Sequence, residues 1–149
     1  MSLAAEMLFF RADPCARAER LIKRFLTPQQ RQDYKQLWGF VVETRDLGPF
    51  LIMWDIAYNI ISVRTGERFC LKTTEESPIP LADLLLTQKM ILECDPNLFV
   101  ARANMTDSWS RVTERTRAAF CVVRARYGMP THAYEIRLHE CAYEDSQCH

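Results

Sequence analysis

The spacing of hydrophobic residues changes once along the chain. Between Gly39 and Thr73, short strand-like segments are separated by turn residues. From Leu81 to Cys94, apolar residues instead recur at spacings of three and four, which indicates an amphipathic helix. Consecutive strands followed by a helix are typical of an α+β fold. The pattern therefore predicts a small antiparallel β-meander that is covered by a helix.

Two hairpins make up the predicted meander. Segments 40–44 and 50–54 flank a link that contains Gly48 and Pro49, and segments 59–64 and 67–72 flank Thr65-Gly66. Two prolines between residues 73 and 80 stop the sheet before the covering helix. The residues expected to cover one face of the sheet are Leu81, Leu84, Leu85, Ile91, Leu92 and Phe99.

Helices are also predicted before the sheet. Asp13-Pro14 follows a short apolar helix expected over residues 2–12 and begins a second helix that runs to about Leu26. Thr27-Pro28-Gln29-Gln30 has the residues of a capping box and predicts a third helix over residues 28–37, which Gly39 is expected to end.

The C-terminal part is predicted to hold one more helix and one more strand. An apolar stripe runs through residues 107–127, and Tyr134, Ile136 and Leu138 alternate with polar residues. The stripe must be buried against another element. We divide the chain into an α+β core domain, residues 1–104, and a C-terminal helix-strand extension, residues 105–149.

The charge of the chain is balanced. Nineteen basic and nineteen acidic residues give a net charge of zero, so no overall field favours nucleic acid or an anionic membrane. Basic residues nevertheless concentrate in residues 11–35 and 102–126. The sequence has no apolar run of membrane-spanning length, and residues 1–11 do not resemble a secretion signal. We expect a cytoplasmic protein that does not bind membranes.

The six cysteines do not form a metal-binding pattern. They are expected to be thiols in a reducing compartment. Thiol and imidazole groups suit zinc, and the tail supplies His132, His139, Cys141, Cys148 and His149, but closed sites use two pairs of ligands with regular spacing. Neither a metal nor another cofactor is predicted.

Catalytic motifs are missing from the sequence. No local motif places a nucleophile next to its base. The sequence also lacks a glycine-rich phosphate-binding loop. We therefore assign no catalytic residue and favour a non-enzymatic protein. Catalytic side chains that converge only in space would leave no motif, so enzymatic activity stays open.

Two kinds of macromolecular partner fit the sequence. The favoured hypothesis is a protein-interaction module that uses the aromatic residues Trp38 and Trp54. The alternative is a nucleic-acid-binding accessory protein, because arginine contacts phosphate well and several arginines fall on the helix predicted over residues 107–127. The arginines of that alternative are Arg111, Arg115, Arg117 and Arg124. The partner and the oligomeric state stay open.

Residues 21–104 also carry a family resemblance. The matching segments are 25–31, 58–67, 86–95 and 98–104, with the sequences FLTPQQR, YNIISVRTGE, LTQKMILECD and LFVARAN. Their order resembles an unnamed small domain of bacterial and phage-associated hypothetical proteins. The resemblance implies an α+β fold in a phage or mobile-element setting and supplies no activity. The chain departs from that pattern after Cys70, where the related domains place a proline.

Overall fold

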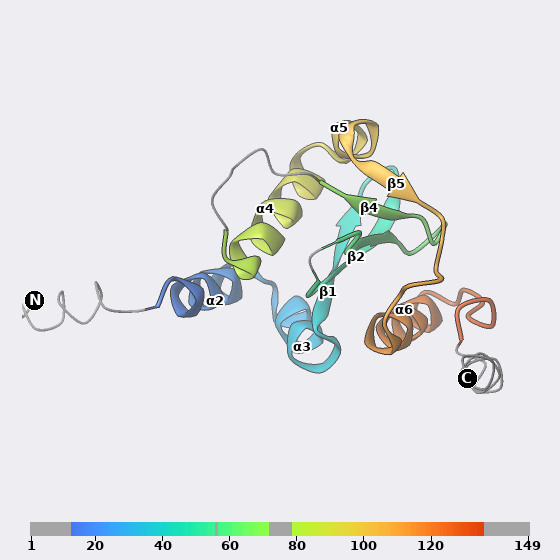
Figure 1. The fold of residues 1–149 in the computed structure, drawn as a ribbon, viewed down its shortest axis with the longest axis horizontal. Helices are drawn as coiled ribbons and strands as arrows, with labels where there is room; N and C mark the ends of the chain where they lie inside the picture. The colour runs from blue at the N-terminus through green and yellow to red at the C-terminus, as the bar shows by residue number, and fades with distance from the viewer. Residues whose placement is uncertain (1–12, 56, 72–78, 136–149) are drawn as a thin grey trace, which may run out of the picture.

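The computed structural model of this chain describes residues 13–55, 57–71 and 79–135, and these residues form one five-stranded sheet and five helices (Figure 1). The α+β class predicted from the sequence is confirmed. The elements, in chain order, are α2 (Pro14–Phe25), α3 (Pro28–Leu37), β1 (Gly39–Thr44), β2 (Gly48–Met53), β3 (Ile60–Ser62), β4 (Arg68–Cys70), α4 (Leu81–Cys94), α5 (Pro96–Arg102), β5 (Asn104–Thr106) and α6 (Glu114–Arg126).

The sheet is antiparallel throughout, in the order β1-β2-β3-β4-β5. The first four strands are the predicted meander. In the β3–β4 hairpin, Gly66 has a φ of 76° and its amide donates to the Ser62 carbonyl. A Cβ atom at Gly66 would lie 2.4 Å from the Tyr134 hydroxyl, so glycine is required both for the turn and for this close approach.

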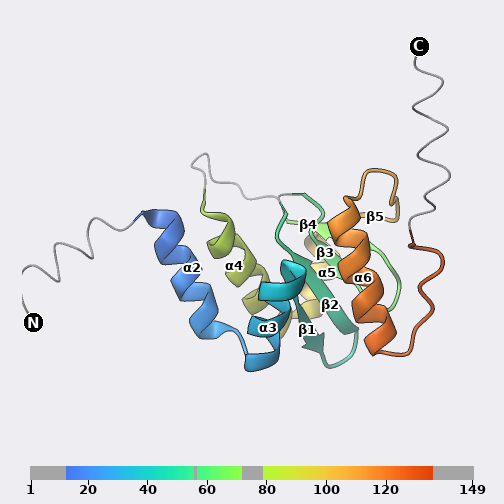
Figure 2. The same ribbon diagram turned by 90° about the horizontal axis from the view of Figure 1, so that it is seen from below.

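Helices cover both faces of the sheet (Figure 2). Alternate residues of a strand point to opposite faces, and Phe50 and Ile52 of β2 pack towards α2, α4 and α5, whereas Leu51 and Met53 pack towards α6. The predicted cover of the first face is confirmed for Leu85, Leu92 and Phe99, which are fully buried in that core, and for Leu81 and Ile91, which are partly buried against it. Leu84 is not part of this core, and Leu86 is buried there instead. The apolar stripe near the C-terminus is buried on the second face. The α6 residues that form it are Ala119, Phe120 and Val123.

Helix α3 packs beside β1, the edge strand of the sheet (Figure 1). It begins at the predicted capping box, in which the Thr27 side chain accepts from the Gln30 amide and the Gln30 side chain accepts from the Thr27 amide. The buried Gln30 side chain also donates to the Val41 carbonyl at 2.8 Å. An edge strand leaves such carbonyls unpaired, so Gln30 gives this one a partner.

The helix predicted over residues 107–127 begins later than expected. It starts at Glu114, where the Thr113 side chain accepts a hydrogen bond from the Thr116 amide. Residues 104–106 instead form β5, which pairs with β4 and was not predicted. The boundary placed between residues 104 and 105 falls inside this strand. A three-residue edge strand has no periodicity of its own, because its pairing depends on a partner distant in sequence.

Two predicted segments lie outside the described residues. They are the helix over residues 2–12 and most of the strand predicted to include Ile136 and Leu138. The first residues of that predicted strand are described, and they do not form a strand: Tyr134 lies in a turn and Glu135 in a bend. Within the described part of the chain, each helix is too short or too polar to cross a membrane.

Candidate functional site

The two tryptophans singled out by the sequence line the same cleft. Trp38 follows α3 and Trp54 follows β2, and the Trp54 amide donates to the Trp38 carbonyl at 2.7 Å. The cleft opens between α2 and α3 and has a volume of ≈ 600 Å³. We call it the aromatic cleft. Its lining residues are Glu19, Lys23, Arg31, Tyr34, Lys35, Trp38 and Trp54.

Trp38 is exposed because of how α3 ends. The helix ends at Leu37, and its C-cap is Trp38, in the left-handed conformation with a φ of 59°; the sequence analysis expected Gly39 to end the helix. Gly39 has a different task, since a Cβ atom there would lie 2.6 Å from the Ile52 carbonyl oxygen. A left-handed bulky residue costs on the order of 1 kcal/mol. The Trp38 side chain is 48% exposed.

Tyr34 joins the two helices at the cleft. Its ring lies 5.8 Å from that of Trp54 in an edge-on arrangement, and its hydroxyl donates to the Glu19 carboxylate at 3.2 Å. Burial raises the pKa of Tyr34, and the Glu19 carboxylate raises it further. The hydrogen bond to Glu19 and the contact with Trp54 together fix the position of the Tyr34 ring in the cleft wall.

Positive charge surrounds the aromatic rings. Lys23, Arg31 and Lys35 line the cleft together with one carboxylate, that of Glu19. In addition, the Arg115 guanidinium lies 4.3 Å from the centre of the Trp38 ring, within the range of a cation–π interaction. The cleft therefore suits a ligand that combines apolar surface with negative charge.

The structure separates the four arginines of the nucleic-acid hypothesis. Arg111 precedes α6, whereas Arg115, Arg117 and Arg124 lie on it. Arg117 donates to the carbonyls of Trp109 and Tyr134. Arg124 is only 8% exposed and donates to backbone carbonyls, among them that of Val63 at 2.7 Å. Two of the four guanidinium groups are therefore engaged within the protein: Arg117 by carbonyls on either side of α6, and Arg124 by carbonyls that include those of Val63 and Arg64, next to β3.

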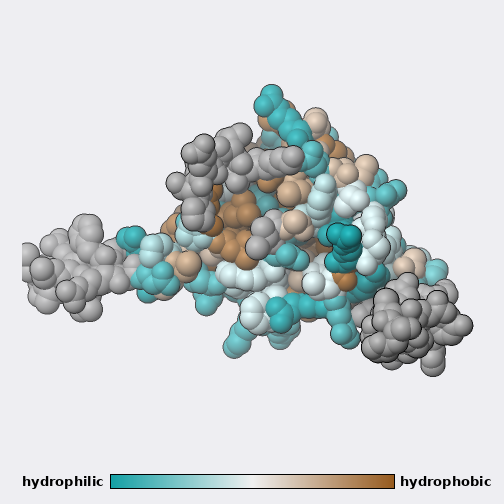
Figure 3. Space-filling view, viewed as in Figure 1, coloured by the Kyte–Doolittle hydropathy of each residue, from teal (hydrophilic) through white to brown (hydrophobic). Residues whose placement is uncertain are grey.

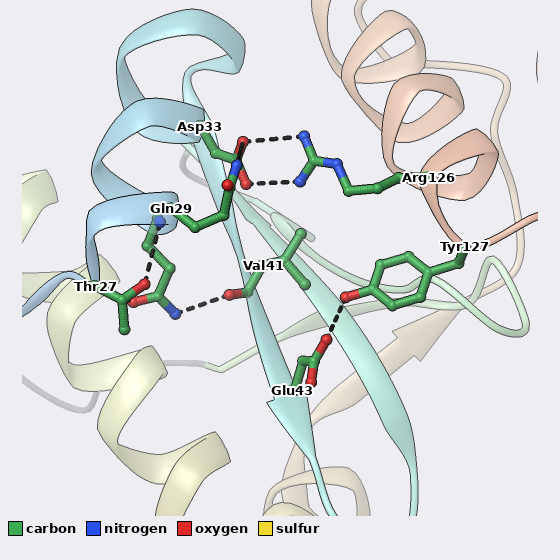
Figure 4. Close-up of polar contacts among 8 residues, drawn as sticks. Thr27, Gln29, Asp33, Val41, Glu43, Arg126 and Tyr127 are labelled. Carbon is green, nitrogen blue, oxygen red and sulfur yellow. Dashed lines mark hydrogen bonds and ion pairs between the residues drawn. The ribbon is translucent and has the colours of Figure 1, made fainter.

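A polar cluster on α3, β1 and α6 was missed by the sequence analysis (Figure 4). Asp33 is 1% exposed, and Arg126 donates to both of its carboxylate oxygens at 2.9 and 3.0 Å. Tyr127 donates to Glu43 at 2.6 Å. Burial and this carboxylate raise the pKa of Tyr127 to about 12, and hydrogen bonding to Asp33 raises the pKa of Arg126. Helical periodicity places Asp33 on α3 but does not reveal its partner.

A cavity of ≈ 500 Å³ lies at this cluster. The carboxylates on its wall are all engaged: Asp33 by Arg126, Glu43 by Tyr127 and Glu93 by Lys89. Because Asp33 pairs with Arg126 and Glu43 with Tyr127, the cluster joins the end of α6 to α3 and β1.

Thiols and metal ligands do not assemble into a site in the described residues. Cys15, Cys70, Cys94 and Cys121 are free, and burial raises the pKa of the Cys121 thiol, which lowers its thiolate fraction. Residues 13–55, 57–71 and 79–135 contain no group of three or more side chains suited to a metal ion. Most of the histidine- and cysteine-containing tail lies outside these ranges.

Comparisons with protein-family models, with curated proteins and with solved structures found no match to this chain. The resemblance of residues 21–104 to a phage-associated domain therefore stays a prediction.

Proposed function

We propose that the chain is a non-enzymatic protein-interaction module and that the aromatic cleft is its docking surface. The observation that carries the proposal is an exposed Trp38 whose backbone is hydrogen-bonded to that of Trp54. Tryptophan, tyrosine and arginine dominate the energetics of protein interfaces, and all three surround this cleft. A cytoplasmic location and a phage or mobile-element setting belong to the proposal and rest on the sequence.

The fixed geometry of the cleft supports this function. Binding costs less free energy when the contacting side chains are already ordered. The rings of Trp54 and Tyr34 contact each other, and Arg115 lies over Trp38. A partner that covers these rings would bury apolar surface without first ordering them.

Site-specific photo-crosslinking tests the proposal. A photoreactive benzophenone amino acid replaces Lys35 beside the cleft or, as a control, Met105 of β5, which lies at the opposite edge of the sheet and is 53% exposed. In extract of the host cell, we expect a specific crosslinked protein from position 35 and not from position 105. The additional substitution Trp38→Ala should remove it, because the main apolar anchor is lost.

The proposal fails if the same protein crosslinks from both positions or if its yield from position 35 is unchanged by Trp38→Ala. A nuclease-sensitive crosslink at position 35 would instead indicate a nucleic acid. Circular dichroism of each variant confirms that its fold is intact.

Nucleic-acid binding is the alternative function. It is favoured by the position of the Arg115 guanidinium over the exposed ring of Trp38. Arg115 and Trp38 could contact a phosphate and stack on a base, respectively. Since Arg117 and Arg124 bind backbone carbonyls, this surface would depend on Arg111 and Arg115. Substituting both by glutamate should then abolish oligonucleotide binding, and affinity of the unaltered chain should fall steeply as salt rises.

A further inference from the structure

A second hollow lies directly beside the aromatic cleft. It opens between α2 and the start of α4 and has a volume of ≈ 800 Å³. Lys23 lines both cavities, so the two adjoin at this residue of α2. We call the second cavity the α2–α4 hollow. Its lining residues are Pro14, Arg17, Ala18, Arg20, Leu21, Lys23, Arg24, Pro80 and Asp83.

The charge of this surface differs from that of the whole chain. Cleft and hollow together are lined by six cationic side chains and two carboxylates, whereas the chain has a net charge of zero. One of the two carboxylates, Glu19, already accepts from Tyr34. Hydrophilic side chains lie over α2 and α3 and hydrophobic ones gather over α4 (Figure 3). The surface is therefore locally basic and complements negative charge.

The apolar part of the hollow is aliphatic. Leu21 is 41% exposed, and Pro14, Ala18 and Pro80 line the same space. Such a wall accepts a leucine-like or aromatic side chain. Single-stranded nucleic acid, by contrast, needs successive aromatic faces for its bases. Trp38 is the most exposed of the cleft's tryptophan and tyrosine residues, since Trp54 and Tyr34 are half-buried and meet edge-on.

We propose that this surface binds an acidic polypeptide segment of the partner, with an apolar side chain in the aromatic cleft and carboxylates along the cations of α2. This inference rests on the proposed function and adds the chemistry of the partner. A polypeptide fits better than a nucleic acid because one surface combines an aliphatic hollow, an aromatic cleft and a row of exposed cations.

A peptide-display selection on the intact chain tests the inference. Random peptides of about twelve residues, long enough to cross one helix, are selected for binding to the chain. We expect the selected peptides to be enriched in Asp and Glu and to carry at least one large apolar residue. Two exposed arginines that line only the hollow are then reversed together, as Arg17→Glu with Arg20→Glu.

The reversal should weaken the best selected peptide about tenfold or more, because attraction becomes repulsion at two positions. The matched control is Arg45→Glu with Arg102→Glu, which changes the net charge equally at exposed positions outside both cavities and should leave the affinity within about twofold. Circular dichroism and thermal unfolding establish that both double variants fold.

The outcomes separate the inference from the proposed function. Peptides that lack acidic residues but lose binding in Trp38→Ala would overturn the acidic partner and leave the docking cleft in place. Binding that is insensitive to Trp38→Ala would overturn both. A selection that enriches no peptide, or a single-stranded oligothymidine that displaces the peptide and binds more tightly, would overturn the polypeptide as occupant.

Discussion

At the scale of single residues, the position of Asp33 is the clearest departure from the sequence pattern. An aspartate in the middle of a polar helix is normally exposed, yet this one is 1% exposed. The burial is possible because Gln29 and Arg126 donate hydrogen bonds to its carboxylate. A buried charge that keeps its partners is tolerated, whereas one that loses a partner is costly.

Arg126→Ala should therefore destabilise the fold. It removes two hydrogen bonds to a buried carboxylate, and we expect a loss of about 1–3 kcal/mol in the free energy of unfolding. The matched control is Arg102→Ala, which removes an exposed arginine from the last turn of α5 and should cost less than about 0.5 kcal/mol. Urea unfolding at neutral pH measures both. If both variants lost the same free energy of unfolding, the ion pair with Asp33 would add nothing to the effect of removing a positive charge from the end of a helix.

At the scale of elements, α6 decides how the second face of the sheet is buried. The sequence shows an apolar stripe but not the surface that it meets. In the structure, Phe120 packs against the rings of Trp109 and Tyr134 and against the sheet residues of the same core. Val122, on the same helix, is 48% exposed. One side of α6 therefore belongs to the core.

This arrangement predicts opposite outcomes for two truncations on α6. Phe120→Ala should cost about 3–5 kcal/mol because it leaves a cavity in a closed core. Val122→Ala should change stability by less than about 0.5 kcal/mol, since its side chain is exposed. Denaturant titration followed by circular dichroism gives both values. A small loss for Phe120→Ala would mean that α6 does not stay packed on the sheet in solution.

At the scale of the whole molecule, two tyrosine hydroxyls join separate layers. Tyr34 connects α3 to α2 through Glu19, and Tyr127 connects the end of α6 to β1 through Glu43. Each hydroxyl can donate only while it is protonated. Burial beside a carboxylate raises both pKa values, that of Tyr127 to about 12.

Alkaline solution should therefore weaken the fold through these two groups. A tyrosine with a folded-state pKa above its unfolded value of about 10 contributes stability that is complete below pH 10 and is lost as pH rises through the folded pKa. We expect the free energy of unfolding to fall between about pH 10 and pH 12. The fall should be smaller in the double variant Tyr34→Phe with Tyr127→Phe. The same fall in both proteins would place the alkaline sensitivity elsewhere.

The elements that the sequence analysis predicted correctly are those with local signals. The Thr27 capping box, the Thr65-Gly66 turn and the period of helix 81–94 all involve residues within a few positions of one another. Their hydrogen bonds close over one turn of helix or one hairpin, so neighbouring residues suffice to specify them. Of the site residues, Trp38 and Trp54 could be chosen as aromatics, but not placed in one cleft.

The remaining features depend on which distant surfaces pack together. Strand β5 forms because β4 offers it a free edge, and Arg124 is buried because the Val63 carbonyl lies within its reach. Trp38 is left-handed, and the next residue, Gly39, lies so close to β2 that a side chain would not fit there. The sequence shows which residues are apolar or charged, and their spacing indicates a helix or a strand. Whether a side chain is buried or paired is decided only when segments far apart in the chain pack into one core. The sequence by itself therefore determined the elements that have local signals, whereas β5 and the cleft between the elements came from packing, because both depend on contacts between segments far apart in the chain.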